Sequence, residues 1–134
     1  MGQKEIQKIL VVEDNMIIQM YLSRTVKDCG FEVIGEARDC DKALELIEQE
    51  QPDLIIMDLG LVGDKDGIET AKIVNRTYNI PIIFITGNSD DHTIERAKKV
   101  NPYDIIIKPI DEDRLISTLL QFKNSSNNPA KQND

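Results

Sequence analysis

The chain has 134 residues, a length typical of one compact domain, and 40% of them are hydrophobic. Its 24 acidic and 16 basic residues give a formal net charge of −8, which argues against binding to nucleic acids or anionic membranes, because both require a concentrated basic surface. No apolar stretch approaches the length of a membrane span, and the first residues, MGQKEIQK, lack the apolar core of a signal peptide. We therefore expect a cytoplasmic protein.

Five short apolar runs recur along the chain. They occupy residues 9–12, 33–34, 54–57, 82–85 and 105–107. They are rich in β-branched residues and mostly lack polar alternation, which is typical of strands covered on both faces in a parallel sheet. The run at 33–34 is the weakest, because Gly35 interrupts it, and we interpret it as an edge strand.

The segments between these runs have the periodicity of amphipathic helices. Their apolar positions are Ile18, Leu22 and Val26; Ala43, Leu44 and Ile47; Ile68, Ala71 and Val74; Ile94, Ala97 and Val100; and Leu115, Ile116, Leu119 and Leu120. Gly30 is predicted to end the first helix, and Asp66, Ser89 and Asp111 to be the N-caps of the third, fourth and fifth. Five strand–helix units predict an α/β fold, with a parallel sheet between two layers of helices.

The end of the chain, KNSSNNPAKQND, is polar and has no periodic apolar residues. We expect a single domain over residues 1–123 and a disordered polar tail over residues 124–134. The two cysteines, Cys29 and Cys40, fit neither a CxxC redox motif nor a zinc site. We interpret them as reduced structural thiols, with a regulatory disulfide as the alternative.

Acidic residues follow two of the predicted strands. In an open parallel sheet, ligands bind beyond the carboxyl ends of the strands. Glu13 and Asp14 follow the first run and Asp58 follows the third. Three converging carboxylates repel one another unless a cation intervenes, and oxygen ligands without His or Cys suit a hard cation. We predict a Mg²⁺ site, which Mn²⁺ could also occupy, formed by these three side chains and the backbone carbonyl of Gly60.

A hydroxyl and an ammonium group follow the last two strands. Thr86 comes after the fourth run and Lys108 after the fifth. Beside a metal–carboxylate cluster, these groups suit the binding of a tetrahedral anion, and phosphoryl transfer is catalysed mainly by such positioning and charge neutralisation. Asp58 could then attack phosphorus in line. The Lys108–Pro109 bond is predicted to be cis, so that the lysine turns back towards Asp58.

The motifs ILVVEDN, LIIMDLGL, DGIE, IIFITGN and IIIKP occur in this order within residues 7–122. In this order they resemble the receiver domain of two-component response regulators. The resemblance implies a flavodoxin-like, doubly wound, five-stranded parallel sheet of order 2-1-3-4-5 with five helices. It also implies a stand-alone signalling switch similar to the chemotaxis receivers.

The resemblance assigns a role to each candidate site residue. It implies that Asp58 is the phosphoacceptor and that Glu13 and Asp14 are the magnesium carboxylates. Thr86 resembles the switch hydroxyl and Lys108 the phosphate-pairing lysine. The phosphodonor would be a sensor histidine kinase, a phosphotransfer protein or acetyl phosphate. The output would be binding to a downstream protein, with neither nucleic acid nor membrane as a partner.

Two positions depart from the pattern of this family. Val62 stands where a proline is usual, and Ile105 stands where an aromatic residue usually lies, three residues before Lys108. In the family, that aromatic ring swings inward on activation, whereas a β-branched isoleucine is stiff at χ1 and has no polar tip. We therefore expect activation to move mainly residues 87–91 and the start of the fourth helix, with Ile105 keeping its rotamer.

Two other functions fit part of the pattern. An intermediate carrier in a phosphorelay would use the same site residues. A magnesium phosphohydrolase of the haloacid-dehalogenase type also uses an aspartyl nucleophile, but it needs a second Asp two residues later, where Gly60 stands. We therefore expect a signalling domain that catalyses only its own phosphorylation and dephosphorylation, not an enzyme acting on external substrates.

Overall fold

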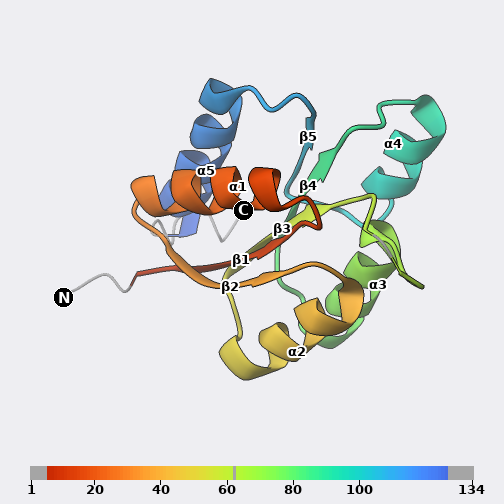
Figure 1. Ribbon diagram of the computed structural model, residues 1–134, viewed down its shortest axis with the longest axis horizontal. Coiled ribbons are helices and arrows are strands. Elements are labelled where there is room, and N and C mark those ends of the chain that lie inside the picture. The colour runs from red at the N-terminus through yellow and green to blue at the C-terminus, as the bar shows by residue number, and fades with distance from the viewer. Residues whose placement is uncertain (1–5, 62, 127–134) are drawn as a thin grey trace.

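The computed structural model describes residues 6–61 and 63–126, and strands and helices alternate along them (Figure 1). The elements are β1 (Lys8–Val12), α1 (Met16–Asp28), β2 (Glu32–Ala37), α2 (Cys40–Glu50), β3 (Leu54–Asp58), α3 (Gly67–Thr77), β4 (Ile82–Thr86), α4 (Asp91–Lys98), β5 (Asp104–Ile107) and α5 (Glu112–Ser126). The five strands form one parallel sheet in the order β2-β1-β3-β4-β5. The predicted fold class and strand order are confirmed.

Helices cover both faces of the sheet: α1 and α5 lie on one side, and α2, α3 and α4 on the other (Figure 1). Every residue of β3 and β4 is buried, because these strands are central and covered from both sides. Each fully buried aliphatic or aromatic side chain stabilises the fold by roughly 1.5–3 kcal/mol. The interpretation as strands covered on both faces is therefore confirmed for the runs at 54–57 and 82–85, whereas Ile107 at the end of β5 is exposed.

β2 lies at the edge of the sheet, as predicted, and most of it is partly exposed. Its pairing with β1 shifts at one point, where Ile9 pairs with Val33 but Leu10 pairs with Gly35. A side chain at Gly35 would also collide with α2, because an ideal Cβ there lies 2.9 Å from Cδ1 of Leu46. The glycine that weakens the strand pattern thus allows α2 to pack closely on the sheet.

The helix ends match the predictions with one exception. Asp66 forms a capping box with Glu69 at the start of α3, and the carboxylate of Asp111 accepts from the first backbone N–H groups of α5. The prediction that Ser89 caps α4 is wrong. Asp90 has the extended backbone of a cap. Its carboxylate accepts from the N–H of Thr93, the third residue of the helix, at 2.7 Å. Ser89 lies one residue too early for this geometry.

The last helix continues past the boundary predicted at residue 123, since α5 ends at Ser126. Phe122 is buried, and the Lys123 ammonium donates to the Cys29 carbonyl at the end of α1 at 3.0 Å. These contacts anchor the end of α5, so the polar residues 124–126 remain helical. The rest of the predicted tail, residues 127–134, lies outside the described residues.

Two further sequence interpretations concern the thiols and the membrane. Cys29 and Cys40 are both free, and Cys40 is buried at the start of α2, in accord with reduced structural thiols. Within residues 6–61 and 63–126, no helix combines the length and apolar character needed to cross a membrane.

Candidate functional site

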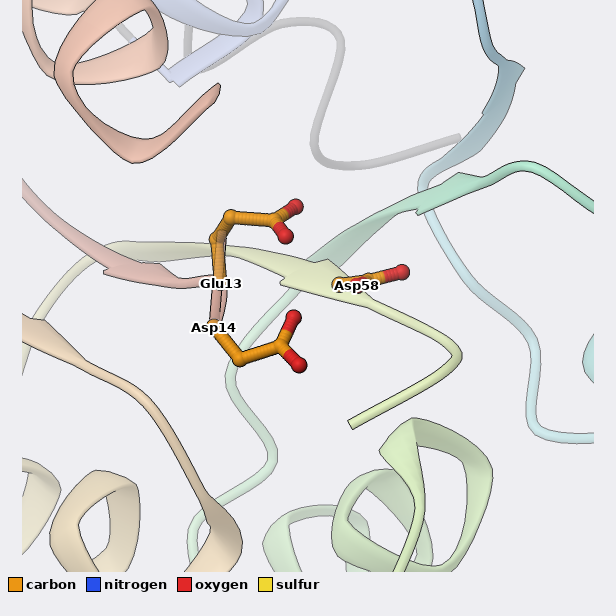
Figure 2. Close-up of side chains that lie close together, drawn as sticks. All are labelled: Glu13, Asp14 and Asp58. Atoms are coloured by element: carbon orange, nitrogen blue, oxygen red, sulfur yellow. The ribbon is translucent and has the colours of Figure 1, made fainter. Parts of the chain in front are cut away.

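Three carboxylates meet at the carboxyl ends of β1 and β3. These strands are neighbours, and Val12 pairs with Met57, so the residues that follow them come side by side. One carboxylate oxygen from each of Glu13, Asp14 and Asp58 lies within 4.8 Å of the others. Figure 2 shows the carboxylates of Glu13 and Asp14 directed towards the side on which Asp58 lies. The predicted acidic cluster is therefore present.

The carboxylate of Glu13 is buried without full compensation. Its Oε2 accepts from the N–H of Asn15 at 3.1 Å, but its buried Oε1 has no hydrogen-bond partner among the described residues. Burial, which removes water from the charged form, is the main reason that the pKa of Glu13 rises from 4.5 to about 7. The nearby charge of Asp58 raises this pKa further, while the Asn15 hydrogen bond and Lys108 lower it.

A buried carboxylate oxygen that accepts no hydrogen bond from the described residues, and that lies beside two other carboxylates, fits a metal ion. Leaving such an oxygen without a hydrogen bond costs about 1–3 kcal/mol. The Lys108 ammonium 3.4 Å away offsets part of this cost, and a hard divalent cation would remove it. The donors are all oxygens, the set that Mg²⁺ prefers in proteins. Glu13, Asp14 and Asp58 could therefore hold a metal ion.

Lys108 reaches the same cluster from the end of β5. Its ammonium nitrogen lies 3.4 Å from Oε1 of Glu13 and 3.6 Å from Oδ2 of Asp58. The Lys108 N–H donates to the carbonyl of Thr86 at 2.7 Å, and the Lys108–Pro109 bond is cis, as predicted. The lysine is thus placed to neutralise the negative charge of Glu13 and Asp58.

Thr86 and Gly60 complete the predicted set. Thr86 is buried, and its hydroxyl donates to the carbonyl of Asn88 at 3.0 Å and accepts from the Asn88 N–H at 2.9 Å. The N–H of Gly60 donates to Oδ1 of Asp58 at 3.1 Å, while metal binding by the Gly60 carbonyl stays a prediction. Thr86, Gly60, Asp58 and Lys108 line one cavity of about 440 Å³, large enough for a bound anion.

Three supporting residues were not identified from the sequence. Gly67 touches the backbone beneath Asp58, since a Cβ there would collide with the carbonyl oxygen of Asp58. Asn15 caps α1 by accepting from the first backbone N–H groups of the helix, and its own N–H holds Glu13. Arg96 lines the cavity from α4. Gly67 in the DGIE motif and Asn15 before α1 could have been identified from the sequence. The position of Arg96 could not, because it depends on how α4 packs.

The unusual Ile105 packs on the α4 side of the sheet. It is half-buried and lines a shallow cavity together with Ile107 and Tyr103. The Tyr103 ring meets the Phe122 ring edge-on, with 5.5 Å between the centroids. The readout expected at Ile105 stays a prediction, and Val62 lies outside the described residues.

The sequence is similar to several response regulators. The transcriptional regulatory protein PdtaR of Mycobacterium tuberculosis is 33% identical over 113 residues, which are 84% of this chain and 55% of that protein. The sensory transduction protein LytT of Bacillus cereus is 36% identical over 119 residues, 87% of this chain and 47% of that protein. The chain thus spans about half the length of these two relatives. The chemotaxis protein CheY of Listeria monocytogenes is 28% identical, with 84% of this chain and 94% of that protein covered.

Solved structures agree with the fold. The signal receiver domain of a modulated diguanylate cyclase from Desulfovibrio desulfuricans is 32% identical, with a TM-score of 0.80, covering 87% of this chain and 93% of that chain. The receiver domain of NtrX from Brucella abortus is 31% identical, with a TM-score of 0.78, covering 84% and 95%. The family model of the response regulator receiver domain matches residues 9–120. This chain therefore belongs to the receiver domains of two-component response regulators.

Proposed function

We propose that this receiver domain is a phosphorylation switch in which Asp58 accepts a phosphoryl group while Mg²⁺ is bound by Glu13, Asp14, Asp58 and the Gly60 carbonyl. The observation that carries the proposal is the buried carboxylate of Asp58, which faces a cavity with Lys108 3.6 Å away and the two other carboxylates beside it. This arrangement combines a nucleophile, a cation and a metal-binding cluster at one point.

In the proposed reaction, the phosphodonor is a phosphohistidine on a sensor kinase or phosphotransfer protein. One carboxylate oxygen of Asp58 forms a bond to phosphorus as the P–N bond breaks, and the ring nitrogen keeps the electron pair. The other ring nitrogen carries a proton, so neutral imidazole leaves. When bound, Mg²⁺ neutralises part of the charge on the phosphoryl oxygens.

The side chains around Asp58 would position the phosphoryl group. Lys108 now spans Glu13 and Asp58 at 3.4 and 3.6 Å, distances that leave its ammonium free to bind a phosphoryl oxygen more closely. Thr86 would have to exchange its hydrogen bonds with Asn88 for one to the phosphoryl group. That exchange would couple phosphorylation to the loop before α4.

We propose that the output is binding to a downstream protein in the cytoplasm. The catalysis proposed for this domain is limited to its own phosphorylation and dephosphorylation. A glycine at position 60 leaves no acid–base carboxylate where the haloacid-dehalogenase mechanism needs one, so turnover of external phosphoesters is not proposed.

Intact-mass measurement after incubation with acetyl phosphate and Mg²⁺ tests the proposal. The wild type should gain one phosphoryl group, and chelation of Mg²⁺ should prevent the gain. Asp58→Asn should gain none, because an amide is a poor nucleophile. Asp64→Asn, a change at an exposed carboxylate, is the matched control and should react as the wild type does. A phosphoryl adduct that persists in Asp58→Asn would disprove the assignment.

A further inference from the structure

A second basic side chain, Arg96, lines the cavity that contains Asp58. It extends from α4, and its guanidinium lies 3.7 Å from Oδ2 of Asp66, the N-cap residue of α3. The other oxygen of Asp66 accepts from the N–H of Glu69 at 2.9 Å. Arg96 therefore connects α4 to the start of α3 beside the proposed phosphorylation site.

The charges of the cavity are divided between its two sides. Lys108 pairs with Asp58 and Glu13 at the strand ends, whereas Arg96 pairs with Asp66 between α4 and α3. Among the cavity-lining residues that the structure describes, Lys108 and Arg96 are the two cations. The cation on the α4 side is thus not used by the acidic cluster at the strand ends.

The pair between Arg96 and Asp66 is weak enough to be exchanged. The two side chains are 39% and 35% exposed, and ion pairs this exposed to water contribute little to stability. A phosphate group carries more negative charge than one carboxylate, and the planar guanidinium can bind two of its oxygens at once. A dianionic ligand in the cavity can therefore compete with Asp66 for the guanidinium.

We propose that Arg96 recognises the anionic phosphodonor in this cavity, and that Asp66 competes with the donor for the guanidinium. The proposal rests on the proposed function of Asp58 and adds a specificity residue to it. In an in-line transfer the leaving group lies opposite the attacking oxygen of Asp58, away from the strand ends that carry Lys108. Arg96 extends from α4 and lines the same cavity as Asp58, so it is available to a donor bound there.

The test is the second-order rate constant for phosphorylation of Asp58 by acetyl phosphate at saturating Mg²⁺. Arg96→Gln should lower it roughly three- to tenfold, the effect of losing one partly exposed charge-assisted contact. Arg96→Lys should restore part of the rate, because it restores the charge without the planar fork. Lys98→Gln removes the same charge from an exposed position on α4 outside this cavity, and it should react as the wild type does.

Asp66→Asn tests the competition. Asparagine is a good N-cap residue, so α3 should keep its cap while Arg96 loses its anionic partner. The rate constant should rise about two- to threefold. The increase is small because the ion pair that Asp66 forms with Arg96 is exposed and weak. Asp64→Asn makes the same charge change nearby, outside this cavity, and should leave the rate constant unchanged. All these differences should shrink at about 1 M salt, which screens exposed charges that lie more than about 3 Å apart.

The outcomes separate the two proposals. A wild type that takes no phosphate would refute the proposed function and this inference with it. A phosphorylated wild type with an unchanged rate constant in Arg96→Gln, or a loss equal to that in Lys98→Gln, would overturn this inference alone. So would an Asp66→Asn acceleration that persists in the double variant with Arg96→Gln, because Asp66 would then not act through Arg96.

Discussion

Replacing Glu13 by glutamine should stabilise the metal-free protein at alkaline pH. The buried carboxylate of Glu13 is 1% exposed, and one of its oxygens has no hydrogen bond among the described residues. Gln keeps the shape of the side chain and carries no charge at any pH. The change therefore removes the cost of a buried anion, together with its repulsion by Asp58, and gives up its attraction to Lys108.

The size of the effect follows from the pKa of Glu13, which rises from 4.5 to about 7 on folding. A carboxyl whose folded pKa lies above its unfolded pKa contributes stability that is complete below pH 4.5 and lost as the pH rises through about 7. One pKa unit corresponds to about 1.4 kcal/mol, so the ionised form costs roughly 3 kcal/mol at pH 8. At pH 5 the cost falls below about 1 kcal/mol, because most of the folded protein holds the proton.

Urea unfolding followed by circular dichroism, with a chelator present, measures this difference. At pH 8, the free energy of unfolding of Glu13→Gln should exceed that of the wild type by about 1–3 kcal/mol. At pH 5 this gap should nearly close. Glu32→Gln, at an exposed position of β2, is the control and should show no such pH dependence. Excess Mg²⁺ should narrow the gap at pH 8, since a ligand at ten times its Kd stabilises the wild type by roughly 1.4 kcal/mol. A variant less stable than the wild type at pH 8 without metal, or a gap independent of pH, would refute this reasoning.

Three other predictions concern the same site. Asp14→Ala should weaken Mg²⁺ binding by at least about 1–2 kcal/mol in a calorimetric titration, and an unchanged affinity would place the metal elsewhere. Gly67→Ala should lower the free energy of unfolding by about 1–3 kcal/mol and slow phosphorylation, because the added Cβ collides with the carbonyl oxygen of Asp58. A variant as stable as the wild type would contradict this close contact. In structures with and without beryllofluoride, residues 87–91 should move while Ile105 keeps its rotamer. A reoriented Ile105 beside a fixed loop would be the contrary result.

The strands and helices could be predicted because the buried positions of each element recur at regular spacings, and apolar residues occupy those positions in the sequence. The run from Leu54 to Met57 is apolar without alternation, and it forms a strand buried on both faces. Leu22 and Val26 recur four residues apart and form the buried stripe of α1. The prediction that Ser89 caps α4 was wrong because capping depends on the local backbone conformation, which the sequence does not specify to within one residue.

The composition of the candidate site was also visible in the sequence, since neighbouring parallel strands end at the same edge of a sheet. Glu13, Asp14, Asp58, Thr86 and Lys108 all follow predicted strands, and all lie at that edge in the structure. The order of the strands came from family resemblance, because hydrophobic periodicity does not say which strands pair.

The sequence by itself therefore determined the elements and the side chains available at the sheet edge. Only the tertiary structure decided their electrostatic state and their partners. Glu13 is an ordinary carboxylate until packing removes its water, and Arg96 meets Asp66, 30 positions earlier, only because α4 packs beside the start of α3. Desolvation and such distant pairs depend on how the helices lie on the sheet, and the spacing of residues along the chain does not encode that arrangement.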